Sequence, residues 1–266
     1  MPDWGEIFAD SEMQRLRPSP EILALVPAWQ EAGCRRVLDA GCGVGRHLLP
    51  LAEAGFQVWG VDSDARVLDF LKERLSRILK ENKSPESTKG KNLYRGLGGE
   101  CRGTACRARS EGGPGRGNPA PTAPGPPLKF QPILLRADLR RLPLAGSVFD
   151  LVLSINVINH GDTQAFQGYC RELDRVLRPG GQLFITVSPR EFGERVLLPH
   201  TRELEPGTWA GSPPRTATWC TIFPAELQAQ FPGYRARRLD TSLRPIPFMG
   251  GVELPQLIFW GEKSTK

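Results

Sequence analysis

Long apolar runs, secretory features and a cysteine framework are all missing from this 266-residue chain. No stretch approaches the roughly 18 apolar residues of a membrane-spanning helix, so we expect no membrane contact. The first ten residues contain Asp3, Glu6 and Asp10 and no apolar run, which argues against a signal peptide. The six cysteines are dispersed, and a disulfide-rich secreted fold is not expected. Together these absences predict a cytoplasmic protein.

Residue sets that bind metals or form catalytic triads are also missing. Histidine occurs three times, at positions 47, 160 and 200, and these positions form no recognisable metal-binding pattern. Cys101 and Cys106 form one close pair, but no second Cys or His pair lies nearby, so we expect no zinc site. We therefore predict that the functional site contains no metal.

The basic excess of the chain is concentrated in one segment. The formal net charge is +6, yet residues 83–127 alone hold eight Lys or Arg against three Glu. The same segment holds ten Gly and seven Pro, a composition that cannot bury enough apolar surface to fold. We predict a disordered insertion that interrupts a single domain formed by residues 1–82 and 128–266. It is either a passive loop or a basic tether for RNA or another acidic partner, and nucleic-acid contact is expected through this segment alone.

Outside the insertion, strand patterns alternate with helix patterns, which is typical of a parallel sheet with helices on both faces. Ser19 and Pro20 mark the start of the first helix, and Asp64 caps a later one. Pro179-Gly180-Gly181 ends another helix. We predict strands at 36–39, 57–62, 132–137, 150–156, 182–187, 234–242 and 252–262, and helices at 20–32, 44–54, 163–178, 224–231 and after Asp64.

The segment Val37–Gly45 predicts the centre of a ligand site. A buried strand ends there, and Gly41, Gly43 and Gly45 allow a sharp turn into a helix whose free N–H groups would face the ligand. The spacing differs from the G-x-G-x-x-G fingerprint of dinucleotide sites. Asp39 precedes the first glycine, and an acid there repels phosphate and suits a cationic amine. This disfavours a nicotinamide-dependent oxidoreductase, for which no hydride-transfer signature is visible either.

Five motifs then occur in a fixed order: Val-Leu-Asp-Ala-Gly-Cys-Gly-Val-Gly at 37–45, Val-Trp-Gly-Val-Asp-Ser-Asp at 58–64, Ala-Asp-Leu at 137–139, Phe-Asp-Leu-Val-Leu-Ser at 149–154 and Leu-Arg-Pro-Gly-Gly-Gln-Leu-Phe-Ile at 177–185. In this order they resemble the class I S-adenosylmethionine-dependent methyltransferases, of type 11 or type 25, including the tellurite-resistance-like small-molecule group. The resemblance implies a Rossmann-like, seven-stranded, mostly parallel sheet with a C-terminal antiparallel hairpin. It also implies S-adenosylmethionine as the cofactor and in-line transfer of its methyl group.

The resemblance also implies roles for single residues. Asp39 would accept from the methionine end of the cofactor, directly or through water, and Asp62 from both ribose hydroxyls. Asp138 would accept from the adenine amino group, and the backbone of Leu139 would bind the edge of the ring. For Asp62 and Asp138, helix capping or a solvated turn is the structural alternative. Asp150 is expected to be structural. The whole predicted cofactor set is Asp39, Gly41, Cys42, Gly43, Gly45, Asp62, Ser63, Asp138, Leu139, Asn156 and Val157.

Three further residues are candidates for contact with the methyl acceptor. Arg46 would bind an anionic substrate or the cofactor carboxylate, unless it is a surface arginine. His160 follows the 150–156 strand and is a candidate general base with a pKa near neutrality. Trp4 lies with Phe8 in a predicted N-terminal cap, residues 1–33, where they either cover the pocket or act as a hydrophobic anchor.

The acceptor itself has no recognisable motif. Residues 188–220 are predicted to be a long substrate-determining loop, with Trp209, Trp219 and Phe223 as an aromatic wall. The Asn/Asp-Pro-Pro-Tyr/Phe motif of many nucleic-acid methyltransferases is replaced by Ser-Ile-Asn-Val at 154–157. We therefore expect a small-molecule substrate, with a monomer or dimer as the assembly. A noncatalytic S-adenosylmethionine-binding relative and an RNA or protein methyltransferase are the alternatives.

Overall fold

The computed structural model describes residues 6, 8, 16–82, 128–197, 201–210, 218–246 and 252–265. The chain divides into two units, one formed by Met1–Glu73 with Leu128–Lys266 and the other by Arg74–Pro127. The first unit holds the strands and the candidate site. The predicted insertion 83–127 lies outside the described residues. In the described part of the chain, no helix combines the length and the apolar character needed to cross a membrane.

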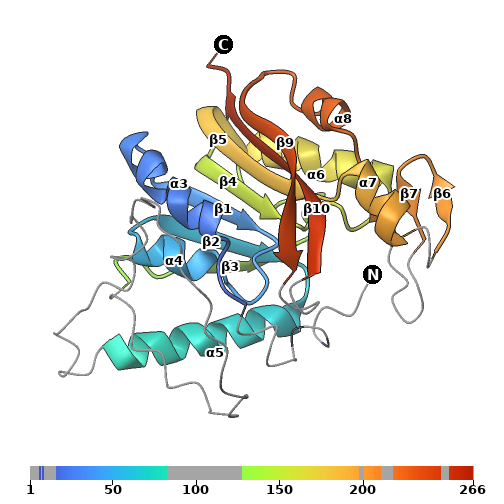
Figure 1. Cartoon of the computed structure of the whole chain (residues 1–266). Helices are drawn as coiled ribbons and strands as arrows, with labels where there is room; N and C mark the ends of the chain where they lie inside the picture. The colour runs from blue at the N-terminus through green and yellow to red at the C-terminus, as the bar shows by residue number, and fades with distance from the viewer. Residues whose placement is uncertain are drawn as a thin grey trace, which may run out of the picture. The chain divides into compact units, whose positions relative to one another are not determined.

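A seven-stranded sheet forms the centre of the first unit, in the order β3-β2-β1-β4-β5-β10-β9 (Figure 1). Strands β1 to β5 run parallel to one another, whereas β10 is antiparallel to both β5 and β9. The predicted Rossmann-like sheet with one reversed strand is therefore confirmed. The strands are β1 (Arg36–Ala40), β2 (Gln57–Asp62), β3 (Ile133–Arg136), β4 (Phe149–Ile155), β5 (Leu177–Val187), β9 (Tyr234–Ile246) and β10 (Val252–Lys263).

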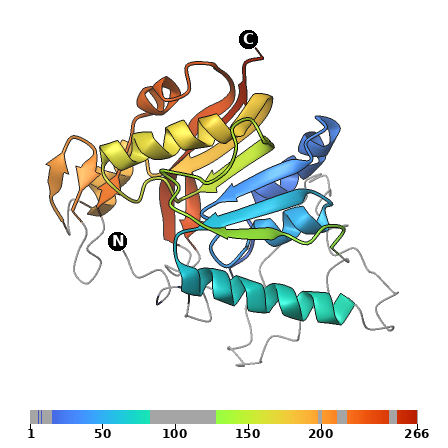
Figure 2. The same ribbon diagram turned by 180° about the vertical axis from the view of Figure 1, so that it is seen from behind.

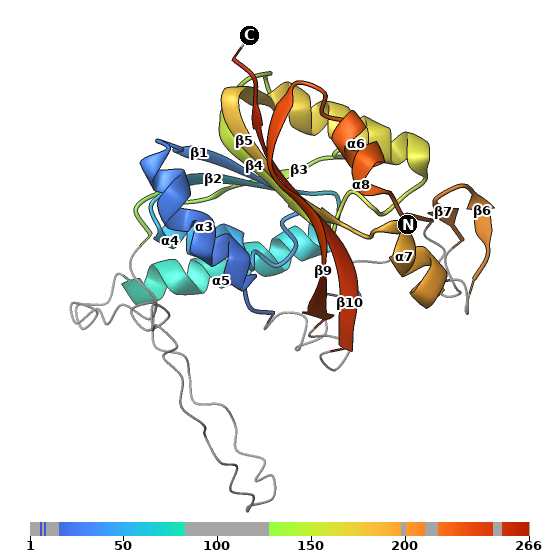
Figure 3. The same ribbon diagram turned by 45° about the horizontal axis from the view of Figure 1, so that its top comes forward.

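Helices cover both faces of this sheet. Figure 3 shows α3 and α4 on one face and α6 and α8 on the other, and Figure 2 shows α6, in yellow, lying across β4 and β5. Each has an apolar side that packs on the sheet, as the helical periodicity predicts. The helices are α3 (Pro20–Glu31), α4 (Leu48–Glu53), α5 (Ala65–Asn82), α6 (Thr163–Val176) and α8 (Pro224–Ala229).

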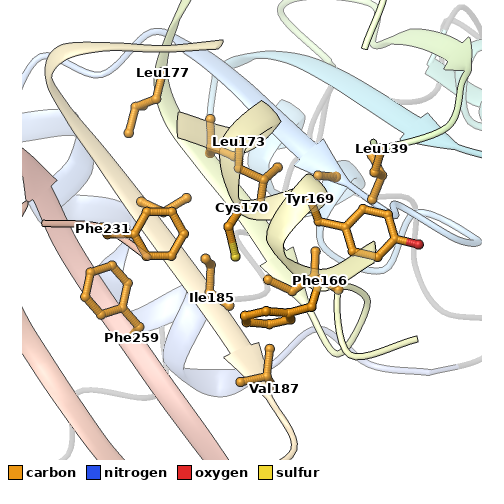
Figure 4. Packing of buried hydrophobic residues seen from close by; sticks show 14 of the residues in the cluster. Leu139, Phe166, Tyr169, Cys170, Leu173, Leu177, Ile185, Val187, Phe231 and Phe259 are labelled. Carbon is orange, nitrogen blue, oxygen red and sulfur yellow. The ribbon is translucent and has the colours of Figure 1, made fainter. Parts of the chain in front are cut away.

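The core between α6 and the sheet is continuous with that beneath α8 (Figure 4). Phe166 and Leu173 of α6 are buried against Ile185 of β5. Phe231 stacks on Phe259, with ring centroids 5.3 Å apart and planes at 17°. Full burial of a side chain of this size contributes about 1.5–3 kcal/mol. This packing holds the end of β4, and hence the loop that follows it, in a fixed place.

Two predicted boundaries and one predicted cap hydrogen bond were wrong. The helix predicted at 44–54 is α4 and begins at Leu48, because residues 41–47 form turns rather than helix. The side chain of Ser19 makes no cap hydrogen bond; its backbone N–H donates instead to Nε2 of His47 at 3.3 Å. The strand predicted at 182–187 begins at Leu177, and Pro179–Gly181 continue it where the register against β4 shifts.

The segment predicted as a long loop, 188–220, is partly folded, so that prediction was also wrong. It contains α7 (Arg190–Phe192), a π-helical turn η2 (Gly193–Leu197) and a three-stranded sheet, β6 (Glu203–Glu205), β7 (Thr208–Trp209) and β8 (Trp219–Cys220). Gly207, with φ of 85°, makes the turn that pairs β6 with β7. Such short strands carry little periodic signal, and burial of Trp209 fixes them.

Candidate functional site

A cavity of about 360 Å³ opens where β1, β2, β3 and β4 end. Because β2 and β4 lie on opposite sides of β1, the chain reverses its winding direction there, and open α/β sheets bind ligands at such switch points. The cavity brings together most of the predicted site residues, namely Gly41, Cys42, Gly43, Arg46, Asp62, Ser63, Asp138, Leu139, Asn156, Val157 and His160.

The glycine turn after β1 presents bare backbone to this cavity. Gly41 has φ of 79°, and a Cβ placed there would lie 2.4 Å from the side chain of Val157. Gly43 has φ of 52°, and its Cβ would lie 3.2 Å from the ring of Phe8. Gly45 also has positive φ but is absent from the cavity wall; its Cβ would meet Leu71 of α5 at 2.5 Å. Two of the three glycines therefore face the cavity, and the third permits helix packing.

Asp62, the last residue of β2, fixes the glycine turn through hydrogen bonds to its carboxylate. Its Oδ2 accepts the N–H of Gly43 at 3.0 Å, and its Oδ1 accepts the N–H of Asp64 at 3.1 Å. Burial raises the pKa of Asp62, and these two hydrogen bonds oppose that shift. Each carboxylate oxygen can accept a further hydrogen bond. Asp62 can therefore receive two hydroxyl groups from a ligand in the cavity.

Asp39 was predicted to line the site, but it lies behind the turn. It is 2% exposed and is absent from the cavity wall. Burial raises its pKa to about 7, against the opposing charge of Arg46 and a hydrogen bond from the backbone of Leu48. Its Oδ2 has no partner among the described residues. A contact between Asp39 and a ligand would therefore need an intervening group, which agrees with the water-mediated form of the prediction.

Arg46 carries a positive charge into the cavity. Burial lowers its pKa, while the negative charge of Asp39 raises it. Within the described ranges the guanidinium forms neither a hydrogen bond nor a salt bridge, so Asp39 is a nearby counter-charge without direct contact. A partly buried cation of this kind attracts an anionic group. Its location agrees with the predicted anion-binding role and contradicts the surface alternative.

Asp138 and Arg140 lie together in the loop after β3. The carboxylate of Asp138 accepts the backbone N–H of Arg140 at 2.8 Å and its Nη2 at 2.5 Å. These bonds to Arg140 lower the pKa of Asp138. Leu139, between them, is 6% exposed and lines the same wall.

Asn156 follows β4 in a left-handed conformation, with φ of 58°. Asparagine tolerates this region better than most residues, and such conformations often occur at ligand sites. The Thr186 hydroxyl donates to its Oδ1 at 3.1 Å, and the backbone N–H of Asn156 donates to the Thr186 carbonyl at 2.9 Å. Both bonds fix the backbone bend that carries Val157 over Gly41.

His160 lines the cavity, yet its predicted near-neutral pKa was wrong. Burial lowers the pKa to about 4, although a hydrogen bond with the backbone of Asn156 opposes the shift. Trp219 packs edge-on against the imidazole, with centroids 4.4 Å apart, and stacks in turn on Phe192. The Nε1 of Trp219 donates to Ser188 at 3.0 Å. This aromatic cover keeps His160 neutral at physiological pH.

The predicted aromatic wall is therefore only partly placed at the site. Trp219 borders the cavity through His160. Trp209 is 2% exposed and donates through Nε1 to Thr221 at 2.9 Å, so it belongs to the core of the small sheet. Phe223 is exposed beneath the guanidinium of Arg190, 5.2 Å from its ring centroid. Trp4 lies outside the described residues.

Several residues of the cavity wall belong to no recognisable sequence motif. His47 lies there as a neutral imidazole, because burial lowers its pKa well below the usual range. Tyr169, on the apolar side of α6, reaches the cavity and donates its hydroxyl to the His160 carbonyl at 3.2 Å. Asp150, by contrast, accepts the N–H groups of Arg35 and Arg36, which fits its predicted structural role. No cluster of metal-ligating side chains is present in the described ranges.

Comparison with protein families gives one match over most of the chain. A family model described as a methyltransferase domain matches residues 10–231. Among curated proteins, glycine N-methyltransferase of Oryctolagus cuniculus is 42% identical over 75 residues, which cover 28% of this chain and 24% of that protein. The chain therefore spans about a quarter of the length of this relative.

Solved structures share the fold over nearly the whole chain. An S-adenosylmethionine-dependent methyltransferase from Methanosarcina mazei has a TM-score of 0.65 at 15% identity, covering 94% of this chain and 100% of that one. The 1,6-didemethyltoxoflavin-N1-methyltransferase of Burkholderia thailandensis, with 1,6-didemethyltoxoflavin and S-adenosylhomocysteine bound, has a TM-score of 0.56 at 15% identity, covering 98% and 83%. At identities this low, the comparison establishes a shared fold only.

Proposed function

Because the chain belongs to the methyltransferase-domain family, we propose that it is an S-adenosylmethionine-dependent methyltransferase with a small-molecule acceptor. The observation that carries the proposal is the arrangement in one cavity of a bare glycine turn, a carboxylate with spare acceptor capacity and a partly buried cation. These three features match the aliphatic part, the ribose and the carboxylate of that cofactor.

The residues of this chain fit the cofactor on structural grounds. A Cβ at Gly41 would collide with Val157, so this backbone is kept clear for close approach of a ligand. The unpartnered Oδ2 of Asp39 favours a cation above the turn. Arg46 suits a carboxylate. When bound, S-adenosylmethionine supplies a methyl group activated by a sulfonium.

The protein's own part is to bind, orient and exclude water. Asp62 accepts the two ribose hydroxyls, and Ser63, Asp138 and Leu139 border the base. Asn156 and Val157, which lie in the cavity wall where Thr186 fixes the backbone, would hold the methionyl part of the cofactor. Fixing both reactants in line accelerates transfer without a strong base.

His160 is assigned a positioning role toward the acceptor. With a pKa of about 4 the imidazole is neutral above pH 5 and is a weak base. A neutral imidazole still forms directional hydrogen bonds with a hydroxyl or an amine. His160 therefore orients the acceptor nucleophile, and the nucleophile loses its proton to solvent during or after transfer.

A small acceptor agrees with the size of the cavity. Its volume of about 360 Å³ lies at the low end of the range for ligand pockets, so the cofactor leaves little space. The names of the relatives, glycine N-methyltransferase and 1,6-didemethyltoxoflavin-N1-methyltransferase, describe enzymes with small acceptors. A cytoplasmic location and a monomeric or dimeric state stay predictions from the sequence.

Calorimetry tests cofactor binding. The wild-type protein should bind S-adenosylhomocysteine and not NAD. Asp62→Asn should weaken binding about tenfold or more, since a charge-assisted acceptor is lost. Asp69→Asn, which changes an exposed carboxylate on α5, is the matched control and should bind normally. Absence of S-adenosylhomocysteine binding by the wild type would refute the proposal.

The acceptor class needs a separate experiment. The protein is incubated with S-adenosylmethionine labelled in its methyl group and with cell extract separated into small-molecule, RNA and protein fractions. We expect label to appear in the small-molecule fraction. Label in RNA or protein alone would contradict the acceptor class and leave the cofactor assignment standing.

A further inference from the structure

Both oxygens of the Asp138 carboxylate are bonded to Arg140. Its Oδ1 accepts from the backbone N–H of Arg140 at 2.8 Å, and its Oδ2 accepts from Nη2 of the same residue at 2.5 Å. The single N–H of Nε is shared between the two oxygens, at 3.1 and 3.0 Å. These three donors leave about one of the four lone-pair sites of the carboxylate. An amino group of a ligand would therefore compete with charge-assisted bonds at either oxygen.

Arg140 is fixed at both ends and faces the cavity. Its stem packs on α6, where a Cβ at Gly168 would lie 3.5 Å from its Cγ. Its head is held by Asp138, which engages Nε and Nη2 only. A guanidinium carries five N–H donors, and within the described ranges Arg140 donates to no other residue through its side chain. The remaining N–H donors of the Arg140 guanidinium are therefore held in place by Asp138, in a residue that lines the cavity wall.

The order of the strands places the base of the cofactor beside Arg140. The glycine turn follows β1, Asp62 ends β2, and Arg140 follows β3, the next strand outward. If Asp62 holds the ribose, the loop after β3 is the part of the cavity wall on the side away from the glycine turn, where the base would lie. The guanidinium then offers free donors to the base, whereas both oxygens of Asp138 are already bonded to Arg140.

We propose that Arg140 is the residue that recognises the base, by donating to purine ring nitrogens, and that Asp138 is a positioning residue that holds Arg140. The inference deepens the proposed function and rests on it. It replaces the sequence-based expectation that Asp138 accepts from the adenine amino group. The site then recognises the purine ring nitrogens, and a ligand that lacks the amino group should still bind.

Calorimetry with two probes tests this recognition: S-adenosylhomocysteine and its 6-deamino analogue, in which hydrogen replaces the amino group. Wild-type protein should bind both within about threefold. Arg140→Ala should weaken both about tenfold, the loss expected for a charged donor. Asp138→Asn should also weaken both to a similar extent, because it releases Arg140. Arg141→Ala, which changes the exposed neighbour outside the cavity wall, is the matched control and should change neither.

Thermal melting of each variant, without ligand, separates lost recognition from lost folding. The inference is overturned if wild-type protein binds the deamino analogue about tenfold more weakly than S-adenosylhomocysteine. It is equally overturned if Arg140→Ala, folded normally, binds S-adenosylhomocysteine as tightly as wild type or more tightly, since freeing Asp138 would then have helped. A wild-type protein that binds neither probe refutes the proposed function itself, and the inference with it.

Discussion

Asp39→Asn should stabilise the ligand-free protein, and the gain should grow with pH. Asp39 is 2% exposed, and one of its oxygens has no partner among the described residues. Asparagine has the same shape, stays neutral and can still accept the hydrogen bond from the backbone of Leu48. The substitution therefore removes the cost of burying a charge and changes little else.

The magnitude follows from the pKa of this carboxyl, which burial raises from 3.8 to about 7. As the pH rises above 3.8, the unfolded chain releases its proton while the folded chain keeps it, so wild type loses stability until the pH passes about 7. Over this range, each pH unit lowers the free energy of unfolding by about 1.4 kcal/mol. The gain for Asp39→Asn is therefore about 4 kcal/mol at pH 8 and about 2 kcal/mol at pH 5. The attraction of Arg46 is already contained in these figures, because it is one cause of the pKa.

Urea unfolding of both proteins without cofactor, at pH 5 and pH 8, measures the difference in the free energy of unfolding. Asp69→Asn, an exposed control, should change it by less than about 0.5 kcal/mol at either pH. The reasoning is refuted if Asp39→Asn is no more stable than wild type at pH 8. It also fails if the gain is equal at the two pH values.

Other predictions concern the turn, the frame of the sheet and the insertion. Gly41→Ala should abolish cofactor binding and cost about 1–3 kcal/mol, because φ is positive and the new methyl group meets Val157; Gly233→Ala, with open space around it, should leave calorimetric binding unchanged. Asp150→Ala should cost about 2 kcal/mol near pH 7, since Asp150 accepts from Arg35, Arg36 and Arg178. Its pKa is lowered in the fold, so this contribution should fade in urea titrations as the pH falls through that lowered value; a constant cost would contradict the ion-pair account. Replacing 83–127 by a short Gly-Ser linker should keep folding and cofactor affinity, and loss of either would contradict its assignment as a disordered insertion.

Local patterns predicted the strands well and the turn-to-helix junction poorly. The strand at 57–62 was predicted with the bounds of β2, because an apolar run between polar flanks has a clear period. The helix after Gly45 was placed four residues too early, because helix propensity does not reveal that 41–47 bond to β2 and to one another as turns. The short strands in 188–220 depend on contacts between distant residues, such as the pairing of Thr208 with Cys220, which no local window contains.

The sequence by itself determined the fold class, the glycine turn and the membership of most predicted residues in one site. The alternation of strands and helices shows in local periodicity, and the turn shows in its glycines. Only the tertiary structure decided the chemistry of those residues. It placed Asp39 behind the turn and raised its pKa, covered His160 with Trp219 from far along the chain, and tied Asp138 to Arg140. Burial and hydrogen-bond partners set the charge and the free donors of a side chain, and both depend on neighbours that folding alone brings together.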